Sequence, residues 1–355
     1  MTLSKENFLS LESSWDFLKN TKLPIFIYGM GDGALKVLRV FEEYRISYCG
    51  FFASDEFVRG HYFEGHKVHT LSEVENEVDE FVIVLAFACG YESLIERVVE
   101  LSKKHTLIVP DVPVIGGGLF TKQYLSDSFD KIKEVYNLLC DEKSKEVFKS
   151  TLAYKITGRI EYLVGISTPP DEAYTNILKP DDNETFVDVG AYNGDTVSEF
   201  IENNNNKYDK IYALEPDKRN FKKLKKNTEG IENIEIFNYA GWNEDTTLIF
   251  SKNSGRQSMV AKQGVEIQAR SVDSILNGRK ATLIKYDVEG AEKEAITGST
   301  NTIINFKPKL KIALYHRNED IFEIPLLIKK MNSNYKLYMR KLPYIPAWEL
   351  NLFCI

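Results

Sequence analysis

The stretch FVDVGAYNGDT, residues 186–196, places an acid and two glycines where an apolar strand pattern gives way to a helical one. Asp188 can bind a cationic amine. Gly190 and Gly194 allow a tight turn, so that backbone N–H groups at the helix start can approach a carboxylate or a phosphate. The next apolar run ends in YALEPD, where Glu215 can accept hydrogen bonds from both hydroxyls of a ribose. The combination predicts a site for a nucleoside that carries an amino-acid group.

A second group of candidate residues lies further along the chain, where two more apolar runs end. IKYDVEGAE carries Asp287 and Glu289, with Glu292 one helical turn beyond them, and IALYHR carries His316. Because parallel strands present their carboxyl ends at one edge of a sheet, we expect these side chains to lie near the nucleoside site. A carboxylate or an imidazole in that position could serve as a general base for a hydroxyl group.

An earlier glycine-rich stretch, IFIYGMGDGA at residues 25–34, has the form of a dinucleotide-binding loop. Gly29 and Gly31 only approximate the GxGxxG spacing, and an alanine stands in the third place. The following strand ends in GFFASDE, where Asp55 or Glu56 could reach a ribose, but no recognisable hydride-transfer site accompanies it. Two alternatives stay open for this part of the chain: an NAD(P)-dependent oxidoreductase, or a module that binds a nucleotide or nucleotide-sugar at this loop.

The amino-acid composition gives no support to nucleic-acid binding, membrane insertion or secretion. The chain has 355 residues, 43% hydrophobic and 27% charged, and a net charge of −7, so it has no general attraction for nucleic acid or anionic membranes. The first twenty residues lack the apolar run of a signal peptide, and no stretch is long and apolar enough to span a membrane. The four cysteines show no CxxC spacing, which predicts free thiols and a cytoplasmic protein.

Hydrophobic periodicity divides the chain into three parts. Alternating strand and helix patterns predict an α/β domain over residues 1–118 and another over residues 170–355. Residues 119–169 carry only helical periodicity and are expected to form a connector. The last two runs, YKLYMRK and WELNLFCI, are typical of a closing antiparallel strand pair.

The second α/β part resembles the FkbM-type methyltransferases. FVDVGAYNGDT, YALEPD, FNYAGW, RSVDSIL, IKYDVEGAE and IALYHR occur in the order and spacing of that family, although Tyr192 and Tyr286 stand where smaller or aliphatic residues are more usual. The resemblance implies a class I methyltransferase fold, Rossmann-like, with a seven-stranded sheet whose last strand inserts antiparallel. It also implies S-adenosyl-L-methionine (SAM) as cofactor and O-methylation of a saccharide, glycan or natural product. The N-terminal stretches YGMGDGA, GFFASDE and GHKVHTLSEV resemble the Rossmann-like N-terminal domains of sugar-modifying enzymes.

Residue by residue, the resemblance implies that the glycine turn lines the methionine end of the cofactor, that Glu215 holds the ribose and that residues 238–240 lie against the adenine. Asp195 and Thr196 are also expected to cap the helix that begins there. The expected cofactor contacts are Asp188, Gly190, Ala191, Tyr192, Asn193, Gly194, Asp195, Thr196, Glu215, Pro216, Asp217, Asn238, Ala240 and Asp287.

The candidate catalytic residues are Asp287, Glu289 and His316. No metal site is expected, because two acids do not make a complete ligand set, although a divalent ion held by Asp287 and Glu289 remains an alternative. A small molecule or glycan is the expected acceptor, which residues 256–258 (Arg256, Gln257 and Ser258) could contact. Gly29, Gly31 and Asp55 could hold a nucleotide or nucleotide-sugar, and a homodimer is also considered.

Overall fold

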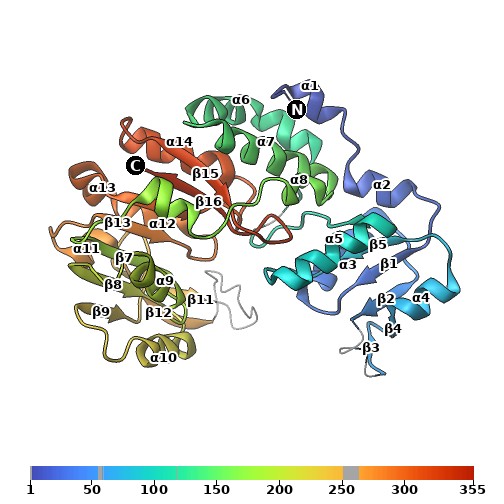
Figure 1. The fold of residues 1–355 in the computed structure, drawn as a ribbon, viewed down its shortest axis with the longest axis horizontal. Helices are drawn as coiled ribbons and strands as arrows, with labels where there is room; N and C mark the ends of the chain where they lie inside the picture. Colours follow the sequence, from blue (N-terminus) through green and yellow to red (C-terminus); the bar gives the residue numbers. More distant parts are fainter. Residues whose placement is uncertain (1, 55–57, 59, 117, 251–263) are drawn as a thin grey trace.

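The computed structural model describes residues 2–54, 58, 60–116, 118–250 and 264–355, and within them two α/β units are joined by a group of helices (Figure 1). The first unit has the strand order β3-β4-β2-β1-β5-β6, and all its strands are parallel except β3. These strands are β1 (Ile25–Tyr28), β2 (Gly50–Ala53), β3 (Tyr62–Phe63), β4 (His66–Thr70), β5 (Val82–Leu85) and β6 (Thr106–Ile108).

Helices cover the first sheet, which explains why every residue of β1 and β5 is buried. They are α3 (Asp32–Tyr44), α4 (Leu71–Glu77) and α5 (Glu92–Lys104), and they follow two short helices, α1 (Lys5–Leu9) and α2 (Ser14–Asn20). The central strands β2, β1 and β5 are parallel, in keeping with the α/β domain that the alternating pattern predicts.

Two glycines of the N-terminal loop have a packing role. A Cβ atom on Gly33 would lie 2.2 Å from the carbonyl oxygen of Ala86, so only glycine lets α3 approach the end of β5 so closely. Gly29 has φ +120°, and a Cβ there would lie 2.8 Å from the Phe87 ring. Gly31 is the N-cap of α3 and faces open space. Asp55 and Glu56, the acids proposed to reach a ribose, lie outside the described residues.

The helical connector packs against both units. It consists of α6 (Lys122–Leu138), α7 (Glu142–Thr157) and α8 (Glu161–Val164), followed by a π-helical turn at Tyr174–Leu178. On α7, Phe148 and Leu152 belong to the core of the second unit, whereas Tyr154 belongs to the core of the first. In Figure 1 these helices lie above and between the two sheets.

The second unit is a seven-stranded sheet in the order β15-β16-β14-β13-β7-β8-β9. Strand β16 is antiparallel to both β14 and β15, so the predicted closing pair and the antiparallel insertion are confirmed. Its strands are β7 (Thr185–Val189), β8 (Lys210–Leu214), β9 (Ile234–Phe237), β13 (Leu283–Tyr286), β14 (Lys309–Ala313), β15 (Leu337–Lys341) and β16 (Leu350–Cys354).

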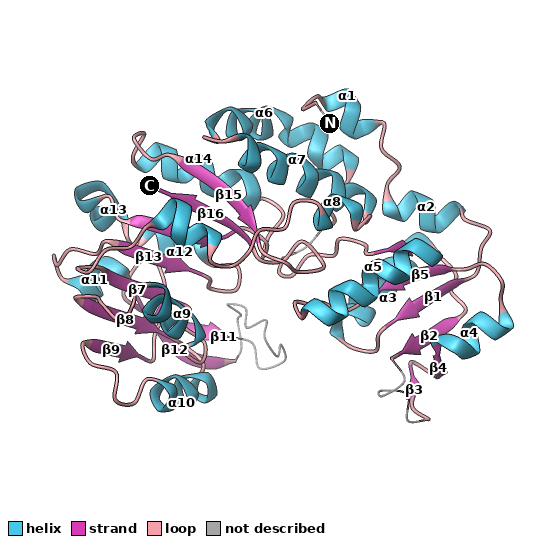
Figure 2. Cartoon of the chain, viewed as in Figure 1, coloured by secondary structure: helices cyan, strands magenta, loops and turns pink. Residues whose placement is uncertain are grey.

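Six helices flank this sheet, and a small three-stranded sheet lies at its edge (Figure 2). The helices are α9 (Asp195–Asn203), α10 (Lys218–Asn227), α11 (Val272–Leu276), α12 (Glu292–Thr297), α13 (Thr300–Phe306) and α14 (Asp320–Met331). The small sheet contains β10 (Ala240–Gly241), β11 (Thr246–Phe250) and β12 (Val265–Arg270). Residues 256–258, the predicted acceptor contacts Arg256, Gln257 and Ser258, lie outside the described residues.

The first unit docks at the carboxyl ends of the strands of the second. The backbone N–H of Ile115 donates to the carbonyl of His316 at 3.0 Å, and Cys89 and Ile345 exchange two backbone hydrogen bonds. Gly90 faces the Tyr344 ring so closely that a Cβ would lie 2.6 Å from it. None of the helices in the described ranges is long and apolar enough to cross a membrane. All four cysteines are free, as predicted.

Candidate active site

A cleft of about 640 Å³ opens at the carboxyl ends of β7, β8 and β13, a volume within the range of small-molecule sites. The glycine turn after β7 contributes to its lining, as do residues of β14 and of the closing strand pair with its loop. Its lining includes ten predicted residues: Gly190, Tyr192, Asp195, Thr196, Glu215, Pro216, Asp217, Ala240, Asp287 and Glu289. Sequence reasoning missed Glu199, Asn220, Gly241, Trp242, Ile267, Lys285, Val288, Ala291, Lys311, Leu342, Glu349 and Asn351, which also line it.

The turn after β7 requires its glycines. Gly190 has φ +91°, and a Cβ on it would lie 1.9 Å from the carbonyl oxygen of Asp287 on the neighbouring strand end. Gly194 has φ +90° and is the N-cap of α9. The capping role expected for Asp195 and Thr196 is therefore wrong: both belong to the first turn, where the Thr196 N–H donates to Asp195 Oδ1 at 2.8 Å.

Glu215 is anchored at the tip of β8 by two backbone donors. The N–H groups of Tyr192 and Asp217 donate to its two carboxylate oxygens at 2.9 and 2.8 Å. Burial raises the pKa of Glu215 to about 7, although these hydrogen bonds oppose the shift. A carboxylate has further lone pairs, so Glu215 can still accept hydrogen bonds from a ligand in the cleft.

Asn238 holds the loop after β8 from outside the cleft. Its side-chain amide donates to the carbonyls of Glu215 and Pro216 at 2.8 and 3.0 Å, and it is absent from the cleft lining. Asn238 therefore fixes the position of the ribose-binding candidate. Ala240, two residues further on, does line the cleft. The other predicted cofactor contacts outside the lining are Asp188, Ala191, Asn193 and Gly194.

Asp188 is completely buried and forms an ion pair with Lys285. The two groups are 3.2 Å apart, and Lys285 Nζ also donates to the carbonyl of Gly190 at 2.8 Å. Burial by itself would lower the pKa of Lys285, but Asp188 and Asp287 raise it above its ordinary value. Asp188 thus supports Lys285 beneath the glycine turn and lies outside the cleft lining.

Asp287 is the carboxylate that the cleft exposes at the end of β13. Its Oδ2 lies 3.8 Å from Lys285 Nζ, and its Oδ1 accepts a hydrogen bond from the Tyr315 hydroxyl at 3.2 Å. Burial by itself would raise the pKa of Asp287, but Lys285 and His316 lower it overall. Its carboxylate is consequently ionised at neutral pH.

His316 lies behind Asp287 and Glu289, and only 1% of its side chain is exposed. Its Nε2 is 3.6 Å from Asp287 Oδ1 and 3.5 Å from Glu289 Oε2, while Nδ1 is 2.9 Å from Glu292 Oε1. Burial by itself would lower the pKa of His316, but the carboxylates, above all Glu292, raise it well above its usual value.

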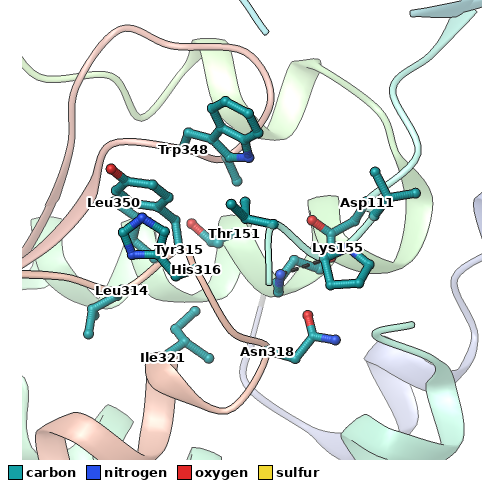
Figure 3. Close-up of a pocket in the computed structure, with 14 residues that line it drawn as sticks. Asp111, Thr151, Lys155, Leu314, Tyr315, His316, Asn318, Ile321, Trp348 and Leu350 are labelled. Carbon is teal, nitrogen blue, oxygen red and sulfur yellow. Dashed lines mark hydrogen bonds and ion pairs between the residues drawn. The ribbon is translucent and has the colours of Figure 1, made fainter. Parts of the chain in front are cut away.

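The other side of His316 faces a cavity of only about 10 Å³, which also meets the connector and the first unit (Figure 3). Asp111 and Lys155 form an ion pair across it at 2.8 Å. A space of this size holds at most one water molecule. His316 therefore reaches a bound molecule in the large cleft only through Asp287 and Glu289.

A comparison with one solved structure agrees with this fold. A crystal structure of methyltransferase FkbM from Methylobacillus flagellatus KT aligns with TM-score 0.69 and 19% identity over 94% of this chain and 90% of that one. A putative methyltransferase from Streptococcus mutans in complex with SAH aligns with TM-score 0.35 and 11% identity, over 53% and 99% of the two chains. No curated protein shows a significant match.

The strand order and the antiparallel insertion define a class I methyltransferase fold. Within it, residues 188–337 match the family model of the methyltransferase FkbM domain. The chain thus carries an FkbM methyltransferase domain, as its sequence motifs predict.

Proposed function

We propose that the protein is a SAM-dependent O-methyltransferase that acts on a hydroxyl group of a saccharide, glycan or natural product. The observation that carries the proposal is the placement of two carboxylates on either side of the glycine turn. Glu215 ends β8, Asp287 ends β13, and both line the cleft on the strands that flank β7. Glu215 would hold the ribose, and Asp287 would face the reacting methyl group.

The charges around the turn suit the amino-acid end of SAM. Lys285 lines the cleft and would attract the methionine carboxylate, together with the N–H groups at the start of α9. With Asp188 engaged by Lys285 and Glu199 engaged by Lys311, the ammonium group would instead be held by Asp195, another carboxylate of the cleft.

The cleft residues from β14 and the closing strand pair suit a hydroxyl-rich acceptor. Lys311, Glu349 and Asn351 offer hydrogen-bonding groups, and the Trp242 indole, which follows β10, adds an apolar surface to the cleft. A few polar groups among apolar ones fix the orientation of a ligand, which matters because an in-line displacement depends on positioning. Asp287 would accept the hydroxyl proton or orient the hydroxyl while the new O–C bond forms and the S–C bond breaks.

Changing Asp287 to asparagine is expected to lower kcat by about a hundredfold or more, because a general base contributes roughly 10²–10⁴ in rate. The affinity for S-adenosylhomocysteine (SAH) should change far less. Single-turnover transfer of labelled methyl from SAM to a panel of saccharides measures the first effect, and calorimetry with SAH the second. Glu294→Gln, on the helix that follows, is the control. Full turnover by Asp287→Asn would remove this assignment.

The affinity for SAH is expected to fall about tenfold when the pH is lowered from 8 to 6. With the pKa of Glu215 raised to about 7, most of its carboxylate is ionised at pH 8 and little of it at pH 6. Protonation removes acceptor capacity from the ribose hydroxyls. Glu215→Gln should weaken binding at pH 8 and flatten the profile, whereas Glu232→Gln, an exposed acid, should change neither. A pH profile identical to wild type in Glu215→Gln would contradict this assignment.

A further inference from the structure

We infer that Asp287, Glu292 and His316 form a binding site for a divalent cation of the Mg²⁺ or Mn²⁺ type, which Glu289 completes from the cleft. The inference rests on the proposed function. Each of the first three residues offers a ligand atom, and these atoms all lie within 4.8 Å of one another. Asp287 and Glu289, the two acids considered for an ion from the sequence, are too few for a ligand set; folding brings the His316 imidazole and the Glu292 carboxylate beside them.

One unpartnered buried atom in this cluster points to a missing ligand. Among the described residues, Glu292 Oε2 has no hydrogen-bond partner, although the Glu292 side chain is 0% exposed. Buried polar atoms without a partner are rare because leaving them so costs free energy. His316 Nδ1 is paired with Glu292 Oε1 at 2.9 Å, so the imidazole would offer Nε2 to the ion. Nε2 lies 3.6 Å from Asp287 Oδ1 and 3.5 Å from Glu289 Oε2. A histidine that binds a metal ion commonly has its second ring nitrogen held by a carboxylate in this way.

Backbone hydrogen bonds also hold the cluster in position. Glu292 Oε1 accepts the backbone N–H groups of Val288 and Gly290 at 2.9 and 3.3 Å, which fixes the carboxylate next to the imidazole. The Glu289 backbone is in the left-handed region with φ +54°. In this conformation its carboxylate lies 3.5 Å from His316 Nε2. Three carboxylates thus surround one imidazole, and carboxylate oxygens are the ligands that hard cations prefer.

The position gives the cation a chemical role, because Asp287 and Glu289 both line the large cleft. An acceptor hydroxyl bound to the ion would have a lowered pKa and would give up its proton more readily to Asp287, the base of the proposed function. The oxygen lone pair then forms the bond to the methyl carbon of SAM. The electron pair of the S–C bond passes to sulfur, and the sulfonium leaves as neutral SAH.

Binding of Mn²⁺ to the full chain, after removal of metal with EDTA, tests the inference. The electron paramagnetic resonance signal of free Mn²⁺ is expected to show about one bound ion per chain. Glu292→Gln and Glu289→Gln should each weaken binding at least tenfold. Glu289 is 46% exposed, so its variant should fold even where Glu292→Gln does not. Glu294→Gln, on the same helix as Glu292, should bind Mn²⁺ like wild type.

Calorimetry with SAH on the same metal-free protein separates the two proposals. Two outcomes overturn the cation site and leave the proposed function standing. In the first, the protein binds SAH but no Mn²⁺; in the second, Glu289→Gln binds Mn²⁺ as tightly as wild type. Absence of SAH binding overturns the proposed function, whatever Mn²⁺ does. With both sites intact, EDTA should lower methyl transfer at least tenfold, and added Mn²⁺ or Mg²⁺ should restore it.

Discussion

Replacing Lys285 with methionine is expected to lower the free energy of unfolding by about 3–5 kcal/mol, the cost of removing one partner of a buried ion pair. Asp188 is completely buried, and its two carboxylate oxygens have no hydrogen-bond partner in the described structure besides the ion pair at 3.2 Å. Without Lys285 the acid must either stay charged in an apolar core or take up a proton. Chemical denaturation followed by circular dichroism measures the loss.

A second variant separates charge pairing from the loss of the side chain itself. The double change Lys285→Met with Asp188→Asn should recover a large part of the stability, because no uncompensated charge then remains. Lys103→Met removes an exposed ion pair with Glu100 and should cost no more than about 1 kcal/mol. If Lys285→Met lowered the free energy of unfolding as little as Lys103→Met, the buried ion pair would not be what holds the glycine turn.

Gly190→Ala is the second change expected to have a large effect, with a loss of about 4 kcal/mol or more, in the range that signals a specific steric conflict. The new Cβ would lie 1.9 Å from the carbonyl oxygen of Asp287, in a backbone conformation with φ +91°. The end of β13 must then move, and Asp287 moves with it. Thermal unfolding measures the stability, and SAH calorimetry should show that binding is lost as well.

Gly278→Ala is a matched control for Gly190→Ala. Gly278 has φ +80°, close to that of Gly190, but a Cβ there would meet nothing within 4 Å. Its substitution should cost only the strain of the left-handed conformation, about 1–2 kcal/mol. Equal losses in the two variants would show that backbone strain, and not contact with β13, makes Gly190 necessary.

Local pattern was enough to predict the strands and the turn of the second unit. The apolar runs ending at Val189, Leu214 and Tyr286 are buried parallel strands, and their tips carry the glycine turn, Glu215 and Asp287. Such patterns work because each strand end is encoded within a few residues. The seven-stranded sheet with its antiparallel insertion followed from the family resemblance and was not read from periodicity.

Sequence analysis did not predict which side chains contact the site residues, because these contacts depend on tertiary packing. Asp188 contacts Lys285, which lies on a different strand nearly one hundred residues away. A signal was nevertheless present in LIKYD, since a period of two places Lys285 and Asp287 on the same face of β13. The burial of His316 behind the acids has no comparable signal, because it depends on docking of the first unit at the Ile115 contact.

The N-terminal glycine loop shows how one pattern can have two physical causes. A glycine that lets backbone approach a phosphate and a glycine that lets a helix approach a strand look the same in sequence. Gly33 belongs to the second kind, because Ala86 occupies the space where its side chain would be. Packing thus accounts for this glycine without any bound dinucleotide.

Calorimetric titration of the full chain with SAH, with NADH titrated in parallel, tests the central claim most directly. The account predicts that about one SAH binds per chain at pH 8, that Glu215→Gln weakens this binding about tenfold, and that NADH releases no binding heat. Binding of NADH in place of SAH, or SAH binding of equal strength in wild type and Glu215→Gln, would contradict it.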